Sequence, residues 1–169
     1  VETIAREAVL IEVSTGKVLF EKNADRPMPP ASMSKMMTIY MLFERLRDGR
    51  LSLEDTFRVS KNAWRKGGAS SGSSTMFLLP GKRVKVEDII RGIIIQSGND
   101  ACIVVAEGLG GDEASFAMMM NETARGLGML DSHFVNASGW PHPEHVTTAK
   151  DLSILARNLI DKFPQYYKS

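Results

Sequence analysis

The sequence predicts a mixed α/β fold of the α+β kind, formed by one domain or most of one. Two apolar runs at residues 8–13 and 17–20 are separated by turn residues, which is the pattern of an antiparallel β-hairpin. Longer apolar stretches at residues 31–48, 87–95 and 113–127 are typical of helices. With 169 residues, of which 43% are hydrophobic, the chain can bury one sizeable core.

The N-terminal hairpin, about residues 7–21, precedes an extended loop and a helix. Ser14 and Gly16 supply the turn of the hairpin. Prolines in residues 23–30 bias their predecessors away from helix, so this segment is expected to be extended. The helix at residues 31–48 is apolar almost all the way round, which indicates a helix buried inside the domain.

This buried helix carries a lysine, Lys35, one turn after Ser32. Burying an ammonium group is costly and lowers its pKa, so a lysine here is expected to be paired or to have a functional role. A neutral amine beside a hydroxyl can activate a serine without a histidine. Ser32 is also expected in the first helical turn, where free N–H groups favour a developing oxyanion.

Two other patterns in the chain could also indicate a reactive serine. Ser14 and Lys17 repeat the three-residue spacing, but they belong to the hairpin turn. Ser70 is the centre of a Gly-x-Ser-x-Gly pattern, which marks a nucleophile only between a strand and a helix. Neither is expected around residues 67–74, whose Gly and Ser content predicts a mobile loop beside a site.

Downstream, short extended segments are followed by helices with recognisable caps. Ser60 and Asp112 are expected N-caps, Gly128 ends a helix, and Thr148 stands three residues before Asp151 in a capping pattern. The expected elements are a strand at residues 56–59, a helix at 60–64, extended pieces at 75–78 and 84–86, and helices at 87–95, 101–107, 113–127 and up to about 160.

Composition excludes several classes of function. Lys plus Arg (21) nearly cancels Asp plus Glu (20), so the formal charge is +1 and the chain lacks the excess of positive charge that binds nucleic acid or an anionic membrane. The single Cys102 forbids an internal disulfide and has apolar neighbours, which indicates a buried thiol. The longest apolar run, at residues 89–95, is too short to span a bilayer.

The three histidines lie in an irregular segment at residues 133–145. His142 and His145 are three residues apart, but prolines at 141 and 143 argue against a helix that presents both to a metal. No His-Glu-x-x-His pattern accompanies them. We therefore predict no metal or other cofactor, and we expect the histidines to be solvated or paired with backbone groups.

Four stretches in the same order give the sequence a family resemblance. They are Ser-x-x-Lys at residues 32–35, Ser-x-Asn at 97–99, and the segments at 134–140 and 147–151. In these the sequence resembles the serine D-alanyl-D-alanine carboxypeptidases, the low-molecular-mass penicillin-binding proteins similar to peptidase family S11. The resemblance covers essentially the whole chain. It implies a fold like that of β-lactamases and transpeptidases, with an antiparallel sheet packed with helices and an all-helical lobe.

Carried over residue by residue, the resemblance implies a role for each motif residue. Ser32 would attack the penultimate D-alanine carbonyl of a peptidoglycan stem peptide that ends in D-Ala-D-Ala. Lys35 would be the general base, Ser97 would relay a proton to the leaving D-alanine, and Asn99 would hold the substrate backbone and help orient Lys35. Water would hydrolyse the acyl-enzyme, and β-lactam antibiotics would acylate the same Ser32.

The implied substrate also implies a location. It places the protein outside the cytoplasmic membrane, in the periplasm or cell-wall space of a bacterium. Membrane association would require an anchor beyond the visible chain.

The family's third motif, Lys-Thr-Gly or a near variant on a sheet strand, is absent, since no lysine here precedes Thr-Gly or Ser-Gly. We therefore expect residues 1–169 to be a catalytic domain that is incomplete at its C-terminal end.

Three alternatives remain. A β-lactamase of the same fold shares the first two motifs, but its Glu-x-x-Leu-Asn loop is absent and Gly98 stands where those enzymes usually carry Asp. A non-catalytic cell-wall-binding homologue would explain the missing third motif, although the four intact site residues argue against it. The third alternative is a globular domain whose motifs are coincidental.

Overall fold

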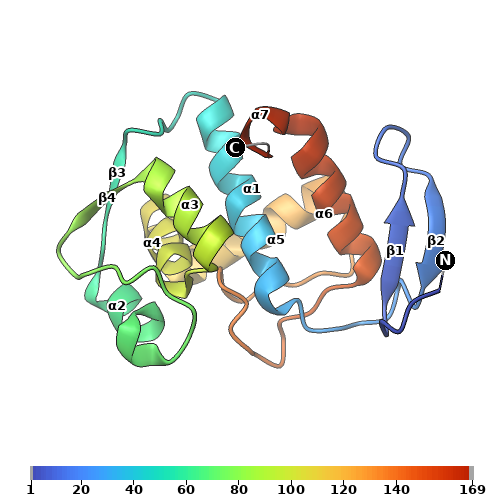
Figure 1. Cartoon of the computed structure of the whole chain (residues 1–169), viewed down its shortest axis with the longest axis horizontal. Helices are drawn as coiled ribbons and strands as arrows, with labels where there is room; N and C mark the ends of the chain where they lie inside the picture. Colours follow the sequence, from blue (N-terminus) through green and yellow to red (C-terminus); the bar gives the residue numbers. More distant parts are fainter. Residues whose placement is uncertain (1, 168–169) are drawn as a thin grey trace.

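Helices make up most of the fold, and two small antiparallel sheets flank them (Figure 1). The protein is represented by a computed structural model that describes residues 2–167. The strands are β1 (Ala8–Ile11), β2 (Val18–Lys22), β3 (Thr56–Arg58) and β4 (Arg83–Lys85). The helices are α1 (Ser34–Arg47), α2 (Lys61–Gly67), α3 (Val86–Gln96), α4 (Asn99–Gly110), α5 (Glu113–Leu127), α6 (Ala149–Lys162) and α7 (Pro164–Tyr167), with 3₁₀ turns η1 (Ala31–Met33) and η2 (Ala69–Ser71).

The predicted N-terminal hairpin is confirmed. β1 and β2 pair antiparallel, with Leu10 opposite Phe20, and Gly16 makes the turn at φ +76°. The hairpin lies at one end of the molecule beside α6 (Figure 1), where Arg157 donates to the Val13 carbonyl at 2.8 Å. Within residues 2–167 this sheet has two strands.

Only one of the two extended pieces expected after the Gly/Ser-rich segment forms a strand. β4 pairs antiparallel with β3, with Val84 opposite Phe57. Residues 75–78 form no strand, because the Met76 and Leu78 amides donate to the Asp100 carboxylate rather than to a neighbouring strand.

α1 runs through the centre of the molecule and contacts α3, α4, α5 and α6 (Figure 1). Its burial all round is confirmed, with Met37, Tyr40 and Leu42 no more than 1% exposed. The α-helix begins at Ser34 rather than at the expected residue 31. Residues 31–33 form a 3₁₀ turn, and the left-handed φ of +49° at Ala31 prevents the α-helix from starting there.

The predicted helix caps are confirmed by side-chain hydrogen bonds. Ser60, Asp112 and Thr148 each accept from the backbone N–H three residues ahead, and Gly128 ends α5 at φ +88°.

α4 extends past the predicted end at residue 107 and includes Gly108 and Gly110. Phe57 and Phe116 pack so closely here that an added Cβ on Gly108 or Gly110 would lie 2.5 or 2.8 Å from them, so this part of the helix requires glycine.

Candidate active site

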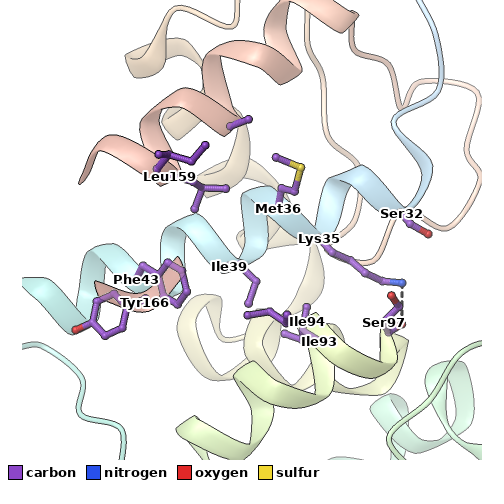
Figure 2. A pocket seen from close by; sticks show the side chains of 12 residues that line it. Ser32, Lys35, Met36, Ile39, Phe43, Ile93, Ile94, Ser97, Leu159 and Tyr166 are labelled. Atoms are coloured by element: carbon purple, nitrogen blue, oxygen red, sulfur yellow. Dashed lines mark hydrogen bonds between the residues drawn. The ribbon is translucent and has the colours of Figure 1, made fainter. Parts of the chain in front are cut away.

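Lys35 is buried in the first turn of α1 and points toward the end of α3 (Figure 2). The side chain is 7% exposed, and Nζ donates a hydrogen bond of 2.8 Å to the Ser97 carbonyl oxygen. Two segments 62 residues apart in sequence therefore meet at this amine.

The surroundings of Lys35 favour the neutral amine. Burial lowers the pKa of Lys35 below its ordinary value of 10.5. An anionic Cys102 would oppose this shift, but burial raises the pKa of the Cys102 thiol to about 12. Cys102 is 0% exposed, as predicted, and stays a neutral thiol at ordinary pH. Lys35 consequently has no anionic thiolate to hold it protonated.

Ser32 lies in η1, directly before α1, on an exposed turn. Its Oγ has no hydrogen-bond partner among residues 2–167. Ser32, Lys35 and Ser97 line one cavity of about 450 Å³ (Figure 2). The structure therefore brings the three predicted catalytic residues together. The rest of the cavity is lined by apolar and aromatic residues, namely Met36, Ile39, Phe43, Ile93, Ile94, Ala156, Leu159, Ile160 and Tyr166.

Ser97 ends α3 in a left-handed conformation, at φ +51°. This conformation is costly for a residue with a Cβ, and such residues gather at functional sites. The chain reverses there, and the Gly98 N–H donates back to the Gly92 carbonyl at 3.1 Å. The reversal leaves the Ser97 carbonyl oxygen free to accept from Lys35.

Asn99, the fourth predicted site residue, is the first residue of α4 and is 8% exposed. Its Oδ1 is buried and has no partner within residues 2–167. Asn99 lines a second cavity of about 420 Å³, together with Arg65, Lys66, Ser71, Ile103, Glu113, Asn136, Ser138 and Trp140. No hydrogen bond joins Asn99 to Lys35, whose amine bonds to the Ser97 carbonyl instead. The expected help of Asn99 in orienting Lys35 is therefore absent from the hydrogen bonds of the described residues.

Asp100 is a residue that the sequence reasoning missed. Its carboxylate is fully buried and accepts four hydrogen bonds of 2.8 to 3.0 Å, from Thr75 Oγ1 and the amides of Met76, Leu78 and Ala101. These bonds fix the loop at residues 75–78 against the Ser-x-Asn turn. A carboxylate at the start of an otherwise apolar helix was the available signal.

The prediction for the histidines was incomplete. His133 and His142 are exposed, but His145 is 3% exposed. Its Nδ1 accepts from the Val135 N–H, as a backbone-paired histidine would, and its Nε2 lies 2.8 Å from Ser34 Oγ. Ser34 and His145 are 111 positions apart in sequence, so no local sequence pattern could predict this contact.

The other candidate serines have structural roles. Residues 68–72 follow helix α2 rather than a strand, so Ser70 is not on a nucleophile elbow. Ser60, which begins a second Ser-x-Asn sequence at residues 60–62, caps α2. In the part of the chain that the structure describes, no three His, Cys, Asp or Glu residues cluster as a metal site would require. None of the described helices has the length and apolar character needed to cross a membrane.

Ser32, Lys35 and Ser97 in one cavity are the residue types that serine–lysine acyl-transfer sites combine. The whole chain, residues 1–169, matches the family described as D-alanyl-D-alanine carboxypeptidase. It is 42% identical to the D-alanyl-D-alanine carboxypeptidase DacC of Escherichia coli over 164 residues, 96% of this chain and 41% of DacC. The chain belongs to the D-alanyl-D-alanine carboxypeptidase family, which confirms the predicted resemblance.

Solved structures confirm the predicted fold class. The crystal structure of the D-alanyl-D-alanine carboxypeptidase DacD from Francisella tularensis has a TM-score of 0.93 and 39% identity, and the match covers 99% of this chain and 40% of that one. Penicillin-binding protein D2 from Listeria monocytogenes, solved in its ampicillin-bound form, has a TM-score of 0.81 and 30% identity, over 95% of this chain and 63% of that one. The chain thus spans about 40% of the length of its carboxypeptidase relatives.

Proposed function

We propose that this chain is the nucleophile-bearing part of a serine D-Ala-D-Ala carboxypeptidase that is also acylated by β-lactams. The observation that carries the proposal is that Lys35 is buried, with a lowered pKa, in the cavity that contains Ser32. Lys35 is 7% exposed, and Ser97 lines the same cavity. A serine and a desolvated amine that line the same cavity are the components of a general-base-activated nucleophile.

The reaction divides into acylation and hydrolysis. Neutral Lys35 accepts the Ser32 proton while Oγ bonds to the carbonyl carbon of the penultimate D-alanine. The bond from that carbon to the terminal D-alanine nitrogen breaks, and Ser97 relays the proton from Lys35 to this nitrogen, which leaves Lys35 neutral again. Water then attacks the Ser32 ester and gives up a proton, through Lys35, to Ser32 Oγ as the ester bond breaks, which releases the shortened peptide as a carboxylic acid.

The second cavity, which Asn99 lines, also supports a peptide substrate. Asn99 Oδ1 is buried without a donor, which is costly unless a ligand satisfies it. A backbone N–H of the stem peptide would supply that donor. β-Lactams carry an amide of the same kind, and the ampicillin-bound structure of the Listeria relative supports their use of this fold.

The proposed substrate also implies where the protein acts. A peptidoglycan substrate implies action outside the cytoplasmic membrane, in the periplasm or cell-wall space. The absent Lys-Thr-Gly motif and the two-stranded N-terminal sheet suggest further strands that carry that motif. We propose that these strands come from protein outside the 169 residues.

The test is acylation of the full natural chain by benzylpenicillin, followed by intact-mass spectrometry and peptide mapping. We expect a long-lived penicilloyl adduct on Ser32 and release of D-alanine from a peptide that ends in D-Ala-D-Ala. Ser32→Ala should abolish both, whereas Ser70→Ala, the matched change at the other candidate serine, should abolish neither. Rapid consumption of penicillin would instead indicate a β-lactamase. Absence of any adduct would indicate a non-catalytic homologue.

A further inference from the structure

The loop at residues 133–146, called the backing loop below, packs against the turn that carries Ser32. Backbone hydrogen bonds of 2.8 and 2.9 Å between its first and last residues close it at its base. Within it, Gly139 has a φ of +92° and lies so close to η1 that an added Cβ would be 1.7 Å from the Ala31 carbonyl oxygen. The backing loop and η1 are therefore in direct backbone contact.

Two side-chain hydrogen bonds join the backing loop to the first turns of α1. Thr38 Oγ1 donates to the Ala137 carbonyl at 2.7 Å. Ser34 Oγ lies 2.8 Å from His145 Nε2, and both residues are buried. The second bond is the nearer of the two to the proposed chemistry, because Ser34 immediately precedes Lys35 and stands two residues after Ser32.

The two ring nitrogens of His145 have distinct roles. Nδ1 accepts from the Val135 N–H at 2.8 Å, so the ring proton is on Nε2 and is donated to Ser34 Oγ. Burial, followed by the charges of His133 and His142, lowers the pKa of His145 to about 4. The ring is consequently neutral at ordinary pH, and its two hydrogen bonds have fixed directions.

The Ser32 turn requires such support. Ala31 has a left-handed φ of +49°, which is costly for a residue with a Cβ and persists only when neighbouring groups hold it. The start of α1 has no side-chain cap of its own. A displacement of about 1 Å at a reacting atom can slow catalysis by about a hundredfold.

We propose that His145 is a positioning residue, which through its hydrogen bond to Ser34 holds the backing loop against η1 and sets Ser32 Oγ relative to Lys35 Nζ. This inference rests on the acyl-transfer function proposed above. It assigns a role to a buried histidine that takes no part in the proposed proton transfers.

The test uses two variants that each keep one of the two ring contacts. In His145→Asn the side-chain oxygen can still accept from the Val135 N–H, but it no longer reaches Ser34. In His145→Gln the amide can reach Ser34, but the Val135 contact is lost. We measure the limiting rate of Ser32 acylation by benzylpenicillin in the full natural chain, well below the melting temperature of each variant.

We expect His145→Asn and Ser34→Ala to lower the limiting acylation rate by about tenfold to a hundredfold, with little change in the penicillin concentration for half-maximal rate. His145→Gln should recover most of the rate. Asn121→Ala is the matched control, because Asn121 on α5 forms hydrogen bonds with the Phe134 N–H and carbonyl in the same loop and, among the described residues, none with α1. It should lose stability but keep the rate.

The inference is overturned if Ser34→Ala acylates at the wild-type rate, a result that holds even where the His145 variants fail to fold. It is also overturned if Asn121→Ala slows acylation as much as His145→Asn does, because the loop would then act only through general stability. An unreactive wild type would refute the proposed function as well, whereas a reactive wild type with a fully reactive Ser34→Ala refutes this inference alone.

Discussion

At the scale of single residues, the proposed chemistry depends on the protonation state of one amine. Lys35 can accept the Ser32 proton only when it is neutral, and its burial shifts the equilibrium toward that form. The same burial would be unfavourable for a lysine with no function, because an ammonium without water or an anion is costly. Cys102 supplies no negative charge to stabilise the Lys35 ammonium, since its thiol stays protonated.

The acylation rate should rise with pH as Lys35 loses its proton, and the midpoint should lie below 10.5 because the pKa of Lys35 is lowered. Lys35→Arg should slow acylation about 10²- to 10⁴-fold and remove this pH dependence, because arginine is not deprotonated in proteins. Stopped-flow acylation across the pH range measures both effects. The control is Lys17→Arg, in the exposed hairpin, which should change nothing. A midpoint at or above 10.5 would contradict the role of Lys35 as a desolvated base.

His145 should make the folded state sensitive to acid. Its pKa is lowered from 6.5 to about 4 in the folded protein, so the unfolded chain binds the proton more tightly. This group therefore costs no stability above pH 6.5, and stability is lost as the pH falls from about 6.5 toward 4. Urea unfolding between pH 7 and 4 measures the loss. His145→Gln should show a shallower decline over this window, and an identical decline in both proteins would exclude His145 as the titrating group.

At the scale of elements, the site is formed where two chain reversals meet. Ala31 and Ser97 both have positive φ, and they lie at the start of α1 and the end of α3. Local sequence predicted the helices and their caps, because a cap depends on residues within one turn. It did not predict either left-handed residue, since neither is the glycine or asparagine that normally signals one.

The contact between the backing loop and η1 gives an element-scale prediction. Gly139→Ala adds a Cβ that would overlap the Ala31 carbonyl oxygen in a conformation that L-residues rarely adopt. We expect a loss of about 2–3 kcal/mol in the free energy of unfolding, together with slower acylation of Ser32.

The control for this change is another glycine to alanine substitution in the same protein. A Cβ on Gly126, within α5, would meet nothing within 4 Å. Gly126→Ala should therefore be neutral or stabilising by up to about 1 kcal/mol, because alanine favours helix. Chemical denaturation measures both proteins. Equal stability of the two variants would mean that the backing loop does not press on η1.

At the scale of the whole molecule, residues distant in sequence complete the site. The motifs predicted Ser32, Lys35, Ser97 and Asn99, because the residues of each motif lie within three positions of one another in sequence. The Asp100 contacts to residues 75–78 and the His145 contact to Ser34 span 22 to 111 positions. Such contacts arise from the packing of helices around α1, which no local pattern encodes.

The outer surface of the fold includes an apolar region next to the proposed active site. Ile94 and Ile95, on the last turn of α3, are 53% and 76% exposed, and they border cavities lined by Phe43 and Tyr166. The N-terminal hairpin, at one end of the molecule (Figure 1), adds strand edges that pair with no further strand within residues 2–167. Exposed apolar regions and free strand edges favour association between molecules.

The 169-residue chain on its own should therefore self-associate as its concentration rises, and Ile95→Lys should reduce this association. A lysine at Ile95 interrupts the apolar region without a cost in burial, and its charge suits the C-terminal end of a helix. Leu130→Lys is the matched control, because Leu130 is 75% exposed but lines none of the cavities described here. Sedimentation velocity at several concentrations separates the two variants. A chain that stays monomeric throughout, or an equal effect of both substitutions, would show that the α3 surface does not drive association.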